Sequence, residues 1–282
     1  MLEKIKQIVK VLHPRYTTIF VDYAEQLGPR YGVTRPPHAK LYEILLSQQE
    51  SINQHIEVAK QYTQWLNGLS EHQTNSHEPY LKNGYMPALD LLMLYALLIQ
   101  EQPQHYIEVG CGTSTRVAFS AKKQHQINTK IIAVDPTPRL PVLDLVDQHI
   151  CATMQSLDIQ WWKQWSDRDL LFIDNSHRAL PGSDVTTFFL EVLPELPKGM
   201  LLHIHDIYWP YDYPTNMCER GYNEQYLLAQ AILLQPERYE IIAANHWFTT
   251  DVVWKQTREA LWASTTNEKL EKTGCSFWCR IK

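Results

Sequence analysis

The sequence predicts an α/β fold built on a doubly wound, mostly parallel sheet with helices on both faces. From residue 105 onward, short apolar runs alternate with segments of helical pattern, which is typical of strands joined by crossover helices. The runs are apolar without interruption, as expected of strands buried on both faces. The first run ends in two closely spaced glycines, Gly110 and Gly112, before a helical pattern begins. In such sheets, ligands bind outside the carboxyl ends of the strands.

Composition and charge limit the class of protein. The chain has 282 residues, of which 44% are apolar and 20% charged, and its formal net charge is −5. This length suffices for a sizeable core, and the lack of a basic surplus argues against a nucleic-acid partner. The sequence contains no run of about 18 apolar residues, so no membrane span is predicted. Five cysteines without zinc-site spacing favour a reduced, cytoplasmic setting. A small-molecule substrate is therefore expected, and an oligomer is possible.

The first hundred residues are expected to be mainly helical. Residues 1–13 interleave charged and apolar side chains, which predicts an amphipathic helix rather than a signal peptide. The polar segment 70–85 predicts a linker, and the apolar segment 86–102 predicts a buried helix. We therefore expect an N-terminal helical cap or substrate region over 1–84 and a ligand-binding domain over 85–282.

Acidic residues follow the predicted strands. Three further apolar runs each end in an acid: Ile131–Asp135, Leu170–Asp174 and Met200–Asp206. A weaker strand is expected over 149–153, and closing strands are expected over 239–245 and 276–281. Because the carboxyl ends of parallel strands meet at one edge, the acids are expected to converge there.

The glycine turn is expected to hold a small ligand. Glycine permits a tight turn and close approach of a ligand to the backbone, and the helix beginning near Ser114 favours an anionic group at its N-terminus. A dinucleotide-binding fingerprint would have a third glycine where Thr115 stands. Asp135 follows Gly112 at the distance typical of an acid that binds ribose hydroxyls. Glu108, just before the turn, could pair with an ammonium group.

S-adenosylmethionine combines a ribose, an amine and a carboxylate, and it therefore matches these groups. NAD has no ammonium to pair with Glu108, and this carboxylate would repel its pyrophosphate. The alternative is that Glu108 only caps a neighbouring helix.

Six short motifs resemble those of the class I S-adenosylmethionine-dependent methyltransferases in order and spacing. They are EVGCGTST, AVD, LLFIDNSH, PGSDV, HIHDIYWPYDYP and YNEQYLL, within residues 85–282. The set is most similar to the small-molecule O-methyltransferase-like subgroup, with its FID-x-SH, GSDV and HDI signature. The resemblance implies a Rossmann-like methyltransferase sheet, S-adenosylmethionine as cofactor, and methyl transfer to a small-molecule acceptor, most often at a hydroxyl oxygen.

The resemblance also implies which residues bind the cofactor. Asp135 would bind the ribose hydroxyls, and Gln155 and Ser156 would lie near the adenine. The expected set of cofactor contacts is Glu108, Gly110, Gly112, Ser114, Asp135, Gln155, Ser156 and Asp174.

Candidate catalytic side chains fall at the carboxyl ends of two strands: Asp174, His177, His205 and Asp206. Methyl transfer to a hydroxyl requires alignment of the acceptor and removal of its proton, and histidine can accept a proton near neutral pH. His205 is preferred as the base because it lies at a rigid strand end, with His177 as runner-up. The resemblance adds Asn223, with Glu224 and Tyr226, as residues facing the site.

A divalent metal is a further expectation, because imidazole and carboxylate together suit zinc, iron or manganese. The catechol O-methyltransferase group holds magnesium with one Asp after a strand and an Asp-Asn pair after the next. Asp174 and Asp206 match this pattern, but Ile207 replaces the Asn.

Two other kinds of protein remain as alternatives. One is a metal-dependent enzyme on the same scaffold, similar to cephalosporin hydroxylase, and the other is a non-catalytic binding protein. The aromatic segment 208–213 is expected either to cover the site or to pack against the N-terminal helices.

Overall fold

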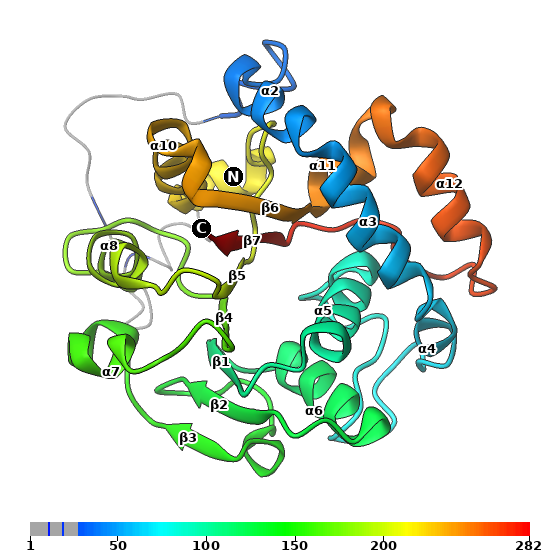
Figure 1. The fold of residues 1–282 in the computed structure, drawn as a ribbon, viewed down its shortest axis with the longest axis vertical. Helices are drawn as coiled ribbons and strands as arrows, with labels where there is room; N and C mark the ends of the chain where they lie inside the picture. Colours follow the sequence, from blue (N-terminus) through cyan, green and yellow to red (C-terminus); the bar gives the residue numbers. More distant parts are fainter. Residues whose placement is uncertain (1–10, 12–18, 20–27) are drawn as a thin grey trace.

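A computed structural model describes residues 28–282 together with residues 11 and 19. The central feature of this part is a seven-stranded sheet in the order β3-β2-β1-β4-β5-β7-β6 (Figure 1). Neighbouring strands pair in parallel except β7, which is antiparallel to both β5 and β6. The doubly wound, mostly parallel sheet expected from the sequence is therefore confirmed. The amphipathic helix predicted over residues 1–13 lies outside the described residues, apart from residue 11.

The strands lie where the apolar runs predict them. Their bounds are β1 (His105–Val109), β2 (Lys130–Val134), β3 (Gln148–Ile150), β4 (Leu170–Ile173), β5 (Leu201–Ile204), β6 (Tyr239–Ala244) and β7 (Phe277–Ile281). Strands β4 and β5 are buried along their whole length, as strands covered by helices on both faces should be. The weaker strand predicted over 149–153 is shorter than expected and ends at Ile150.

Helices cover both faces of the sheet. Figure 1 shows α7 (Ile159–Lys163), α8 (Asp184–Thr187) and α10 (Glu224–Leu234) on one face, and α3 (Gln49–Lys60), α5 (Ala88–Glu101) and α6 (Thr113–His125) on the other. Helix α8 continues as one π-helical turn, Phe188–Val192. The remaining α-helices of the described residues are α2 (Ala39–Ser47), α4 (Thr63–Asn67), α9 (Thr215–Glu219), α11 (Asn245–Thr250) and α12 (Lys255–Ala263).

The N-terminal helices share the hydrophobic core of the sheet. Buried side chains of α2, α3 and α4, such as Leu45, Ile56 and Leu66, belong to the same cluster as the residues of β1 and β4. Helix α3 packs on α5 and on β6. The boundary near residue 84 stays a prediction.

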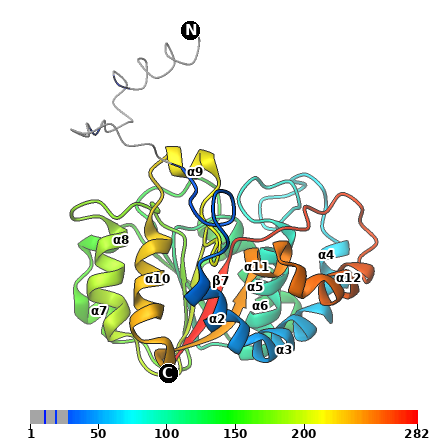
Figure 2. The same ribbon diagram turned by 90° about the horizontal axis from the view of Figure 1, so that it is seen from above.

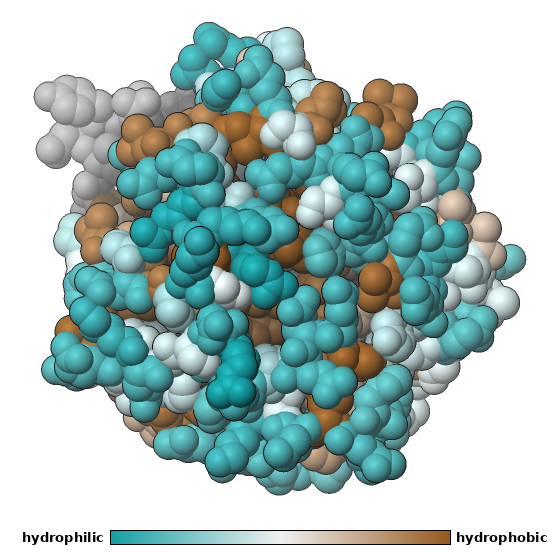
Figure 3. Space-filling model, in the orientation of Figure 1, coloured by the Kyte–Doolittle hydropathy of each residue, from teal (hydrophilic) through white to brown (hydrophobic). Residues whose placement is uncertain are grey.

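The carboxyl ends of the parallel strands form one edge of the molecule. In Figure 2 the segment before α5, the segment before β7, and α9 lie along this edge, and the C-terminus lies at the opposite one. Figure 3 shows a face that is mostly hydrophilic. Among the described residues, no helix is both long and apolar enough to cross a membrane.

Candidate active site

Gly110 joins the ends of three strands. Its φ is +83°, and a Cβ at this position would lie 2.1 Å from the carbonyl oxygen of Asp174. The Gly110 amide donates to Val134 at 3.1 Å, and the Asp174 amide donates to Val109 at 3.0 Å. The requirement for glycine here therefore comes from the approach of β4 to the turn. A Cβ on Gly112 would meet only Leu140, at an ordinary 3.5 Å.

Glu108 fastens the first turn of α6 to the end of β1. The carboxylate is completely buried and accepts hydrogen bonds from Tyr106 at 3.1 Å, Ser114 at 2.8 Å and Thr115 at 2.5 Å. Burial raises the pKa of Glu108 to about 7, although the three hydroxyl groups oppose this shift. These contacts correspond to the helix-capping alternative. A contact between Glu108 and an ammonium group stays a proposal.

The side chains of Ser114 and Thr115 organise the start of α6. Ser114 does not cap its own helix, because its hydroxyl donates to Glu108. Instead, the Gly112 amide donates to the side chain of Thr115 at 2.9 Å. The position at which a dinucleotide fingerprint has glycine thus carries a side chain that closes the turn.

Asp135 lies beside the glycine turn, as expected. Its carboxylate accepts a hydrogen bond from the Cys111 amide at 3.1 Å and another from the Thr137 amide at 2.7 Å. Gln155 and Ser156 follow β3 in a short 3-10 turn, and both are exposed. All three residues remain candidates for contacts with a nucleoside.

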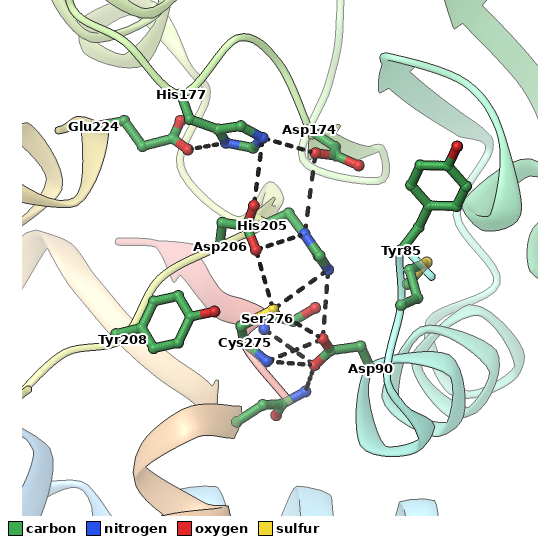
Figure 4. A network of polar contacts seen from close by, with 12 residues as sticks. Tyr85, Asp90, Asp174, His177, His205, Asp206, Tyr208, Glu224, Cys275 and Ser276 are labelled. Atoms are coloured by element: carbon green, nitrogen blue, oxygen red, sulfur yellow. Dashed lines mark hydrogen bonds and ion pairs between the residues drawn. The ribbon is translucent and has the colours of Figure 1, made fainter. Parts of the chain in front are cut away.

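The four residues predicted at the ends of β4 and β5 do come together (Figure 4). His177 Nε2 lies 3.4 Å from Asp174 Oδ1 and 3.5 Å from Asp206 Oδ2. His205 Nδ1 lies 3.5 Å from Asp206 Oδ1 and 4.0 Å from Asp174 Oδ1. The two imidazoles and two carboxylates therefore form one continuous group, called here the acid–imidazole cluster.

A buried acid holds the other nitrogen of each imidazole. His177 Nδ1 contacts Glu224, at the start of α10, and His205 Nε2 lies 3.4 Å from Asp90 Oδ2 in α5. Burial alone would lower the pKa of each histidine, but the surrounding carboxylates outweigh it and raise both pKa values well above the ordinary value. Such pairing fixes the orientation of each ring.

Asp90 is a site residue that the sequence reading missed. Its completely buried carboxylate accepts hydrogen bonds from Asn245 at 2.7 Å and from the amides of Cys275 and Ser276, both at 3.0 Å. A Cβ on Gly274 would lie 2.7 Å from Asp90 Oδ1, so glycine allows this segment to approach. The available signal was a single acid among the otherwise apolar residues 86–99.

Cys275 is a second residue that the sequence did not indicate. Its Sγ lies 3.3 Å from Asp206 Oδ1 and 3.4 Å from Asp90 Oδ2. Asp90, His205 and Cys275 offer ligand atoms within 4.8 Å of one another. The thiol reaches the cluster from the segment before β7, which is distant in the sequence.

Two residues of the cluster have unusual backbone conformations. His177 has φ +61° and Asp206 has φ +55°, in the left-handed region that non-glycine residues seldom adopt. Asn223 accepts a hydrogen bond from the Ala179 amide at 2.6 Å, and its own amide donates to the His177 carbonyl at 3.0 Å. Asn223 therefore holds the loop that carries His177 and makes no capping bond to α10.

The aromatic segment after β5 is mostly packed. Trp209 and Tyr213 are buried, and Trp209 contacts the rings of Tyr31 and His38 near the N-terminal helices. Tyr208 instead directs its hydroxyl toward the cluster (Figure 4). Packing near the N-terminal helices therefore describes Trp209, whereas Tyr213 packs with Cys218 and Tyr222 and Tyr208 borders the site.

The four side chains of the cluster differ in how much of each is exposed to solvent. The side chain of Asp174 is 32% exposed, compared with 14% for Asp206, 9% for His177 and 3% for His205. An incoming acceptor would therefore meet Asp174 first. Two hollows of about 530 and 780 Å³ lie elsewhere, one at the amino ends of the strands and one between α3 and α12.

Carboxylate and imidazole groups are donors that suit a divalent transition metal. Among the described residues, however, the group whose potential ligand atoms all lie within 4.8 Å of one another is Asp90, His205 and Cys275. A metal ion at Asp174 and Asp206 therefore stays a proposal. Ile207 is buried and offers no oxygen-bearing side chain, so the magnesium pattern with Asn is not reproduced.

A family comparison covers the central part of the chain. Residues 107–207 match a family model described as a methyltransferase domain. This span is 101 of the 282 residues, and it includes the glycine turn, Asp135 and the whole acid–imidazole cluster. The match supports the methyltransferase class expected from the sequence. Among curated proteins, none matches the chain.

Similar solved structures are remote in sequence. The SAH-bound methyltransferase PaMTH1 of Podospora anserina is 11% identical over 80% of this chain and 88% of its own, with a TM-score of 0.41. The O-methyltransferase of Bacillus cereus in complex with SAH is 12% identical over 81% and 91%, with a TM-score of 0.40. The branched-chain polyamine synthase of Thermus thermophilus is 12% identical over 80% and 64%, with a TM-score of 0.40. The fold assignment rests on the strand order and not on these values.

Proposed function

We propose that the protein transfers a methyl group from S-adenosylmethionine to a hydroxyl oxygen of a small molecule. The supporting observation is that the glycine turn and the acid–imidazole cluster are in direct contact. Gly110 lies against the carbonyl of Asp174, and the Asp174 amide donates to Val109. A donor lying across the turn would thus have its reactive end beside imidazole and carboxylate groups.

The donor would lie across the ends of β1 and β2. Asp135 would bind the ribose hydroxyls, and Gln155 and Ser156, beyond β3, would lie near the adenine. Gly110, Gly112, Ser114 and Glu108 would border the methionine portion, and Asp174 would mark the boundary with the acceptor.

Methyl transfer is a displacement at carbon, so the enzyme must align the acceptor oxygen with the methyl group and the sulfur. The acceptor proton must also leave, and an imidazole of the cluster would take it after losing its own proton, which the raised pKa values of both rings shift to a pH well above 6.5. His205, held by Asp90, is the base that the sequence favours. His177, held by Glu224, retains the larger exposed fraction and is the second candidate. Asp206 lies between the two rings, and Asn223 positions the loop of His177.

A metal ion held by Asp174 and Asp206 would supply a positive charge to orient and acidify the acceptor hydroxyl. The family match does not favour the alternative of a metal-dependent enzyme that transfers no methyl group.

The test uses the full chain and S-adenosylmethionine carrying a labelled methyl group, with a panel of phenols, sugars and hydroxylated polyketides as acceptors. Labelled product with the wild type, and clearly less with the Asp135→Ala variant at a donor concentration near the wild-type Kd, would support the proposal. Binding of the donor without transfer to any acceptor would favour a binding protein. Metal-dependent turnover of an acceptor without label would favour the alternative enzyme.

A further inference from the structure

Arg116 is an anomaly in the first turns of α6. Its side chain is completely buried, and none of its three guanidinium nitrogens has a hydrogen-bond partner among the described residues. A guanidinium group stays charged in proteins. Burying a charge without a partner is costly, so buried charges are normally paired or bind a ligand. The arrangement is therefore that of a site for an anion.

A second unpartnered group lies on the same face of the helix. The hydroxyl of Thr113 is also buried, without a hydrogen-bond partner in the described part of the chain. Residues three apart on a helix are neighbours on its surface, so Thr113 and Arg116 present a hydroxyl and a guanidinium together. Both belong to the start of a 13-residue helix, where free amides and the helix dipole favour negative charge.

The polar linker covers this face. The ring of Tyr80, in segment 70–85, lies 5.7 Å from the Arg116 guanidinium carbon, within the range of a cation–π contact. An aromatic ring keeps the guanidinium in place but cannot neutralise it as a carboxylate would. An anion entering between the linker and α6 would supply the missing partner.

We infer that Arg116 and Thr113 bind the α-carboxylate of S-adenosylmethionine and thereby select it over donors that lack this group. This inference rests on the proposed function. The carboxylate is the one anionic group of the donor, and Arg116 lies four residues after the glycine turn that the donor would cross.

The experiment compares two ligands that differ by one carboxylate: S-adenosylmethionine and decarboxylated S-adenosylmethionine. Dissociation constants are measured by calorimetry for the wild type, Arg116→Gln, Thr113→Val, and the control Arg168→Gln. Arg168 is an exposed arginine at the opposite edge of the sheet. The wild type and the control should bind S-adenosylmethionine about 10- to 100-fold more tightly than the decarboxylated form.

In Arg116→Gln this preference should fall to within about three-fold, because only the affinity for S-adenosylmethionine is lost. Thr113→Val should show a smaller loss of the same kind, and it keeps the inference testable if Arg116→Gln fails to fold. If Arg116 had a purely structural role, the variant would lose affinity for both ligands equally, and the inference would be wrong. The inference would also be wrong if both variants kept the wild-type preference for S-adenosylmethionine. If the wild type binds neither ligand, the proposed function fails, and the inference fails with it.

Discussion

Replacing Gly110 with alanine should destabilise the protein more than the same change at Gly112 or Gly182. The left-handed conformation at φ +83° costs a residue with a Cβ about 1–2 kcal/mol. In addition, the new Cβ would lie 2.1 Å from the Asp174 carbonyl oxygen, a backbone atom. Relief of this clash must separate β1 from β4, at the cost of about 1 kcal/mol for the hydrogen bond between the Asp174 amide and Val109. The total is roughly 3 kcal/mol.

Two matched variants separate these contributions. Gly182 has φ +70° with no atom within 4 Å of a Cβ, so Gly182→Ala should cost only the conformational strain, about 1 kcal/mol. Gly112→Ala meets an ordinary contact of 3.5 Å and should cost less than about 1 kcal/mol in the free protein. Urea unfolding followed by tryptophan fluorescence measures all three free energies. If Gly110→Ala and Gly182→Ala lower the free energy of unfolding equally, the close approach of β4 is not what requires glycine at position 110.

The remaining predictions concern Glu108, His205, His177 and Asp135. The pKa of Glu108 is about 7 when folded and 4.5 when unperturbed, so the folded state retains the proton and stability should fall by about 3 kcal/mol as the pH rises from about 4.5 to 7. Denaturation at pH 5 and pH 8 should show a smaller decrease for Glu108→Gln, and an equal decrease would contradict the assignment. His205→Ala should lower kcat by about 10²- to 10⁴-fold while the Kd for S-adenosylmethionine stays within three-fold. If His177→Ala alone has this effect, the base is His177. Asp135→Ala should weaken cofactor binding by about 10-fold or more without loss of fold; an unchanged Kd would exclude the ribose contact.

Local sequence patterns were sufficient to place the strands and the residues that follow them. Asp174 and Asp206 each come directly after or close to an apolar run, and a parallel sheet brings such positions to one edge. Their convergence with His177 and His205 could therefore be predicted. The chemistry of this edge follows from the order of the strands, which the pattern largely determines.

The residues that contact this cluster from distant parts of the sequence could not be predicted in the same way. Asp90 meets His205 across 115 positions of sequence, and Cys275 reaches the cluster from the final segment before β7. The spacing of apolar residues along a strand or helix does not indicate such contacts, because they depend on how distant segments pack. Arg116 is a similar case: an arginine at this position of a helix is ordinary, and its significance lies in its burial without a hydrogen-bond partner among the described residues.

A crystal structure of the full chain with S-adenosylhomocysteine, the product left after methyl transfer, would show whether the donor binds at the carboxyl edge of the sheet. We expect electron density across the Gly110–Gly112 turn, with the ribose at Asp135, the carboxylate at Arg116 and the sulfur facing the acid–imidazole cluster. Density only in the hollow at the amino ends of the strands, or a carboxyl edge still closed by its own side chains at saturating ligand, would contradict this expectation.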